Sequence, residues 1–118
     1  LVDKHQMHLF PNVQLNFTAR SLELYRHRPH AQHPERCLFD EQRLDRVVPG
    51  QAPPRVARNR FRHGEHPLGP VMGQDVDLLP SLQAGMRSAG FPGLLLTEQE
   101  PCIAHLHRQL ERWLEEPA

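Results

Sequence analysis

The chain has 118 residues, which is enough for one domain of common size, and 38% of them are apolar, so only a modest core is possible. Its 14 Lys and Arg residues balance its 14 Asp and Glu residues, and this balance favours neither a nucleic acid nor a membrane surface as a partner. No apolar run approaches the roughly 18 residues of a membrane helix, and no signal peptide precedes the body, so we expect a cytoplasmic protein.

The first part of the chain, residues 4–48, has the pattern of an antiparallel sheet. Apolar residues recur with the two-residue period of strands in three runs, and the alternating residues of the first two runs are Met7, Leu9, Val13, Leu15, Phe17, Leu22 and Leu24. The third run extends from Arg36 to Val48. Between the second and third runs, Pro29 and Pro34 predict a loop. Short connections between the runs predict a meander.

Residues 49–70 have a different composition, with five prolines, three glycines and no apolar period. We expect a long Pro/Arg-rich loop insertion within a single domain, 1–118. Four arginines give this loop a basic stripe: Arg55, Arg58, Arg60 and Arg62. No recognisable nucleic-acid-binding module accompanies them, so we interpret the stripe as part of a solvated loop.

Two helices are predicted in the last part of the chain. The first has an apolar stripe at helical spacing, formed by Leu78, Leu79, Leu82 and Met86. Because Pro80 is tolerated only near a helix start, we expect Asp77 to cap this helix and Asp75 to lie just outside it. The last helix is expected to open with the capping-box pattern of residues 97–100, and its apolar face is Ile103, Leu106, Leu110, Trp113 and Leu114. The sequence therefore predicts an α+β fold in which a long C-terminal helix packs on an antiparallel sheet.

Three stretches, in order, resemble the catalytic domain of Rieske-type non-haem iron oxygenase large subunits. His8 to Leu15 contains a Phe-Pro-Asn strand motif, Leu24 to Asp40 is similar to the next two strands, and Asp75 to Ser88 is similar to the closing region. The resemblance covers nearly the whole chain except the Pro/Arg-rich loop. It implies a helix-grip (START-like) fold, of which this chain is a partial copy.

The resemblance also implies chemistry. In this family a mononuclear Fe(II), held by two histidines and one carboxylate, activates O₂ and hydroxylates an aromatic or small organic substrate. Asp75 matches the carboxylate by its distance to Gln83, and Asp77 is the alternative ligand. Asn12 matches a strand position near the substrate cavity, and an equally good interpretation is a turn asparagine after Pro11.

Several parts of the family pattern are not found in these 118 residues. The two-iron two-sulfur cluster needs a Cys-x-His and a Cys-x-x-His pair. Cys37 does not begin the first pair, and the spacing of Cys102 and His105 matches the second by coincidence, because it lies on the expected last helix. We therefore expect the cluster and the two iron histidines to lie upstream, in a longer protein, and the isolated chain to be inactive. The resemblance further implies a ferredoxin or reductase as electron donor, a homotrimer of the full subunit and, in some members, a small partner subunit.

Two alternatives of other classes stay open. A non-enzymatic helix-grip domain would use its cavity to bind a small hydrophobic ligand. A small metal-binding protein would use the closely spaced His27, His30, His33 and Cys37, since imidazole and thiolate are the usual zinc ligands. We favour exposed polar histidines here, because a strand followed by a loop gives their three-residue spacing no fixed geometry.

Overall fold

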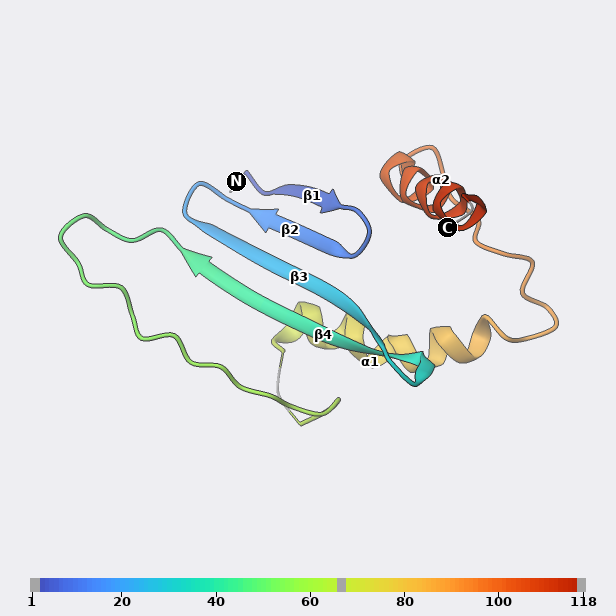
Figure 1. Ribbon diagram of the computed structural model, residues 1–118, viewed down its shortest axis with the longest axis horizontal. Helices are drawn as coiled ribbons and strands as arrows, with labels where there is room; N and C mark the ends of the chain where they lie inside the picture. The colour runs from blue at the N-terminus through green and yellow to red at the C-terminus, as the bar shows by residue number, and fades with distance from the viewer. Residues whose placement is uncertain (1–2, 66–67, 117–118) are drawn as a thin grey trace. The chain divides into compact units, whose positions relative to one another are not determined.

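The structure, a computed structural model, describes residues 3–65 and 68–116. Their strands and helices are β1 (His5–Leu9), β2 (Val13–Phe17), β3 (Ser21–His30), β4 (His33–Asp45), α1 (Pro70–Gly85) and α2 (Pro101–Glu115). The chain divides into two compact units, one formed by Leu1–Pro53 with Glu98–Ala118 and the other by Pro54–Thr97. The first unit holds the sheet and α2, and the second holds α1 (Figure 1).

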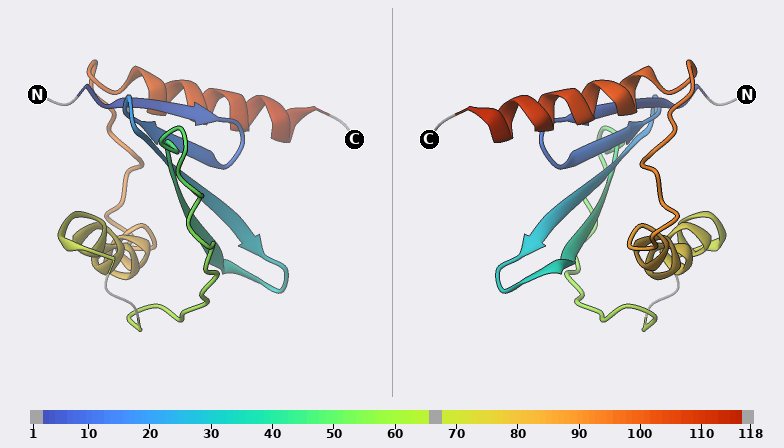
Figure 2. Two further views of the ribbon diagram at one scale, coloured as in Figure 1. Left: turned by 90° about the vertical axis from the view of Figure 1, so that its left-hand side faces the viewer. Right: turned by 90° about the vertical axis from the view of Figure 1, so that its right-hand side faces the viewer.

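The sheet is an antiparallel meander with the strand order β1-β2-β3-β4 (Figure 1). The predicted α+β class and the antiparallel meander are confirmed. The run that we predicted around Met7 and Leu15 forms two paired strands, with Met7 opposite Leu15. β3 and β4 continue past the end of their pairing with β2 and form a two-stranded hairpin that projects from the sheet (Figure 2).

The loop that we predicted around Pro29 and Pro34 is wrong, since both prolines lie inside strands and the turn is only residues 31–32. The backbone N–H of His27 donates to the carbonyl of Asn12 on the β2 side. Pro29, two residues further along, has its nitrogen on that same side, where β2 no longer pairs with β3. Its missing N–H therefore costs no ladder hydrogen bond, and β4 is an edge strand, where proline is tolerated as well.

The register gives the sheet one apolar and one polar face. Residues that are paired across strands share a face, which places on the apolar face Met7, Leu9, Val13, Leu15, Phe17, Leu22, Leu24 and Leu44. This face is incompletely covered, because Met7 is 48% and Leu44 is 50% exposed. Among the described residues only Tyr25 and Asn16 are buried, and both lie on the polar face. The described part of the chain thus has very little core of its own.

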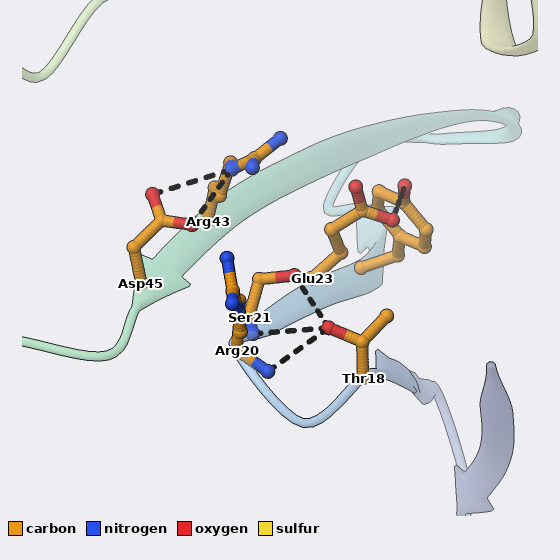
Figure 3. Close-up of polar contacts among 7 residues, drawn as sticks. Thr18, Arg20, Ser21, Glu23, Arg43 and Asp45 are labelled. Carbon is orange, nitrogen blue, oxygen red and sulfur yellow. Dashed lines mark hydrogen bonds and ion pairs between the residues drawn. The ribbon is translucent and has the colours of Figure 1, made fainter. Parts of the chain in front are cut away.

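The turn between β2 and β3 is fixed by one threonine hydroxyl (Figure 3). The Oγ1 atom of Thr18 accepts hydrogen bonds from the backbone N–H groups of Arg20, at 3.2 Å, and Ser21, at 3.1 Å. A short polar side chain that bonds the backbone two or three residues ahead is a common turn device. The turn sets the register that brings Leu22 opposite Phe17.

Helix α1 begins eight residues earlier than we predicted, since its N-cap is Gly69 and not Asp77. Pro70 occupies its first turn, Gly69 precedes it with φ of 79°, and Pro80 lies inside the helix. Asp77 is therefore not the cap and Asp75 is not outside the helix, which corrects both expectations. Proline is favoured at the first helical position because its missing N–H would have no partner there. At Pro80 the helix instead loses the bond to the carbonyl of Val76 and continues.

Helix α2 also begins at a proline. Its N-cap residue is Glu100 and not Thr97, so the helix begins after the predicted capping box at 97–100. The helix has 15 residues and is no longer than α1, which has 16, so our expectation of a long C-terminal helix is corrected. Its residue Trp113 packs edge-on against Phe10, which directly follows β1, with ring centroids 5.8 Å apart. Within the described residues, no helix has the length and apolar character that crossing a membrane requires.

Candidate functional site

The two candidate carboxylates both lie on α1, on opposite faces. At 3.6 residues per turn, residues two apart are separated by about 200° around the axis. Asp75 and Asp77 therefore cannot face the same site. Both side chains are exposed in the structure.

Asp75 lies in the middle of the apolar stripe of α1. Leu78 and Leu79 lie one turn after it, Leu82 lies two turns after it, and Val71 lies one turn before it. These apolar side chains are between 55% and 73% exposed. The neighbours of Asp77 at the same spacings are small or polar: Gly73, Gln74, Pro80 and Ser81. Only Asp75 of the two carboxylates is thus surrounded by side chains that favour burial.

Asn12, the candidate substrate residue, lies in the β1–β2 turn of the other unit and is half-buried. The side-chain Nδ2 of Asn12 donates a hydrogen bond to the backbone carbonyl of His27 at 2.7 Å. The backbone carbonyl of Asn12 accepts one from the backbone N–H of His27 at 3.0 Å. The side chain therefore has a structural task, which is to tie the turn to β3. Within the described residues, no hydrogen bond engages its Oδ1.

The family resemblance implies an iron ion at the catalytic centre. The described residues bring together no group of three or more His, Cys, Asp or Glu side chains that could hold a metal ion. A site of two histidines and one carboxylate is therefore not complete within them. Cys37 and Cys102 are free, exposed thiols.

The histidine group that we considered as a zinc site is not assembled as a whole. His27 packs against Phe39, with ring centroids 5.1 Å apart, and Cys37 lies opposite Pro29. His30 and His33 do come together, at the ends of β3 and β4, with ring centroids 5.0 Å apart. These two histidines are strand residues, not the loop residues that we expected.

The strongest electrostatic cluster of the described residues was not recognised in the sequence. Asp40 of β4 accepts hydrogen bonds from Arg28 Nε at 2.7 Å, Arg28 Nη2 at 2.8 Å and Arg26 Nε at 2.9 Å. These bonds, chiefly those from Arg28, lower the pKa of Asp40 to about 2, and the same contact raises the pKa of Arg28. The available sequence signal was the spacing of Arg26 and Arg28, which places both guanidinium groups on one face of a strand.

An open cleft of about 480 Å³ lies between β1 and α2. It is lined from the β1 side by Gln6, Met7, His8 and Phe10, and from α2 by Pro101, Cys102, His105, Leu106, Arg108 and Gln109. The lining mixes apolar and polar side chains, and the cleft is wide open to solvent. It is not an enclosed substrate cavity of the kind that buries a small ligand.

Comparison with known proteins assigns the chain to a family. Residues 1–116 match the family model described as the ring hydroxylating alpha subunit (catalytic domain). No curated protein and no solved structure matches the chain. The match covers almost the whole chain and agrees with the resemblance carried by the three stretches from His8 to Ser88. The chain therefore belongs to the family of ring-hydroxylating oxygenase alpha subunits and represents part of their catalytic domain.

Proposed function

We propose that this chain is the C-terminal part of the catalytic domain of an oxygenase that hydroxylates an aromatic or small organic substrate with O₂. In the complete protein, the electrons would come from a two-iron two-sulfur cluster in an upstream domain, supplied by a ferredoxin or reductase. The membership in the ring-hydroxylating family supports the reaction class. We also propose that the complete subunit forms a homotrimer, to which a small partner subunit is added in some members of the family.

In this proposal Asp75 is the carboxylate ligand of a mononuclear Fe(II), with two histidines from outside residues 1–118. The observation that carries the assignment is the place of Asp75 within the exposed apolar stripe of α1. We infer that the exposed apolar stripe of α1 is a surface that another part of the complete domain covers. A carboxylate in the middle of a covered face needs a partner, because burial of an unpaired charge costs several kcal/mol. A bound metal ion is such a partner. Asp77 has small or polar neighbours, so its face gives no reason to expect burial or a bound ion.

We further propose that Asn12 lies at the wall of the substrate site. Its Nδ2 is used by the carbonyl of His27, so its Oδ1 is the atom available to accept a hydrogen bond from a substrate. The role is a positioning one, and it rests on the fixed geometry that the two bonds to His27 give the turn.

The test compares Asp75→Ala and Asp75→Asn with Asp77→Ala in the complete alpha subunit. Asp77 is the matched control, since it lies on the same helix, is also exposed and faces the opposite way. We expect both Asp75 variants to bind Fe(II) at least about tenfold more weakly, as follows from loss of a direct ligand, with unchanged circular dichroism. Asp77→Ala should keep the wild-type iron content, measured with a colorimetric chelator.

The opposite pattern, with iron lost only in Asp77→Ala, would move the ligand to Asp77. Wild-type iron content in all three variants would refute the assignment of a carboxylate ligand to α1. Loss of iron together with loss of helical circular dichroism in Asp75→Asn would show a structural role instead.

A further inference from the structure

The tip of the β3–β4 hairpin brings two histidines together, directly after a register irregularity between Pro29 and His30. His30 is the last residue of β3, His33 is the first residue of β4, and they are register partners across the two-residue turn Ala31–Gln32. Residues opposite each other in an antiparallel pair have side chains on the same side, close enough to interact. The tip lies beyond the end of the pairing with β2 (Figure 1), and there His33 is exposed and His30 is half-buried.

The separation of the two rings fits a shared metal ion. Their centroids are 5.0 Å apart and their planes are tilted by 37°. Metal–imidazole bonds of about 2.0–2.1 Å, with the ion in the plane of each ring, place the centroids of two imidazoles on one tetrahedral ion about 5 Å apart. The rings therefore need little movement to bind one ion together.

The available ligands restrict the ion. Imidazole nitrogen suits Zn²⁺, Cu²⁺ and Ni²⁺, whereas Mg²⁺ and Ca²⁺ prefer oxygen. His27 and Cys37 are held elsewhere by Phe39 and by the strand register, and the described residues contain no group of three ligands. Water would complete the coordination sphere.

One hydrogen bond at the tip competes with the ion. The backbone N–H of Gln32 donates to Nδ1 of His30 at 3.2 Å, so this nitrogen holds its lone pair toward the backbone. A metal bound at Nδ1 displaces this bond directly, and binding at Nε2 requires the proton to move to Nδ1, which ends the bond as well. The bond is solvent-exposed and long, so water can replace it at little cost.

From this geometry we propose that His30 and His33 form a two-imidazole site for one borderline transition-metal ion of the Zn²⁺, Cu²⁺ and Ni²⁺ class. The site is independent of the proposed function, because it uses neither Asp75 nor Asn12. It is a local property of the hairpin tip.

The test measures Zn²⁺ binding to the purified protein by competition with a chromophoric chelator. The variants are His30→Ala, His33→Ala and the double variant, with His27→Ala as a control for a larger cluster and His63→Ala as a control for an exposed histidine outside the hairpin. We expect the wild type to bind one Zn²⁺ more than the double variant. Each single variant should weaken that binding by about tenfold or more, because one of two protein ligands is lost. His27→Ala and His63→Ala should bind like the wild type.

Equal stoichiometry in the wild type and the double variant would overturn the proposal. Weakening by His27→Ala as large as that by His30→Ala would overturn it too, because the site would then be a larger cluster. A second measurement does not depend on the folding of variants. Cu²⁺ added to the wild type should give an electron paramagnetic resonance spectrum with coupling to two imidazole nitrogens, and coupling to one or none would refute the paired site.

Discussion

Replacement of Asp40 by asparagine tests the electrostatic reasoning most directly. The carboxylate receives three hydrogen bonds from Arg26 and Arg28 across the β3–β4 hairpin, and these lower its pKa from 3.8 to about 2. Asparagine keeps the size of the side chain and removes the charge. It also leaves two guanidinium groups side by side without their shared anion.

The magnitude follows from the pKa and from the exposure of the partners. A change from 3.8 to about 2 corresponds to roughly 2 kcal/mol of stability, at about 1.4 kcal/mol for each pH unit. The Asp40 side chain is 25% exposed and both arginine side chains are 44% exposed, so solvent screening reduces this value to about 1 kcal/mol. We expect Asp40→Asn to lower the free energy of unfolding by about 1 kcal/mol at pH 7.

The pH dependence has a defined sign. Because the folded-state pKa is below the unfolded value, the stabilisation is complete above the unfolded value of 3.8 and is lost as the pH falls toward about 2. The difference in unfolding free energy between wild type and Asp40→Asn, measured by urea titration, should therefore be constant from pH 7 to about 5 and shrink below about 4. Added salt should reduce it at every pH.

Asp45→Asn is the matched control on the same strand. Asp45 pairs with Arg43 at 3.2 Å, with both side chains more than 60% exposed, so its replacement should cost less than about 0.5 kcal/mol (Figure 3). Equal effects of the two variants would refute the reasoning. So would a difference for Asp40→Asn that grows as the pH falls below 4.

Two further outcomes are expected. Asn12→Ala removes the bond to the carbonyl of His27 and should lower stability by about 1 kcal/mol, while in the complete enzyme it should raise KM more than it lowers kcat; an unchanged KM would contradict the substrate-site proposal. Trypsin should cut first within 55–62, where four arginines lie in exposed backbone without helix or strand, and mass spectrometry showing a first cut at Arg26 or Arg43 would contradict this.

The sheet could be predicted well from the sequence because its period is short and local. The alternation of Met7, Leu15 and Leu24 survives in the observed register, where Leu15 lies opposite both other residues. The turn was misplaced because proline disrupts a strand only where a backbone N–H is needed to bond the neighbouring strand. Whether β2 extends far enough to pair with Pro29 depends on the pairing of the strands and cannot be read from the segment around Pro29.

The helix starts were harder to predict for a related reason. Pro80 was interpreted as a start signal, yet the helix passes through it, and the informative prolines were Pro70 and Pro101 at the first helical positions. A proline inside a helix and one at its start have the same local sequence appearance. Because α1 begins earlier than predicted, Asp75 and Asp77 both lie within the helix and face opposite sides of it, which distinguishes the two carboxylates more clearly. The ion cluster at Asp40 was beyond local reasoning, because it joins residues 12 and 14 positions apart.

The two edge strands of the sheet, β1 and β4, each disfavour the addition of a further strand, for different reasons. β1 has five residues, which gives an added strand little to pair with. β4 has 13 residues, enough for a strand of another molecule to pair with it. It carries Pro34 and charged residues along its length: Glu35, Arg36, Asp40, Glu41, Arg43 and Asp45. Proline and mixed charges on an edge work against the strand-to-strand addition that leads to aggregates. Self-association of this chain would therefore proceed through the incompletely covered apolar face of the sheet, with side chains and not backbone groups forming the contact.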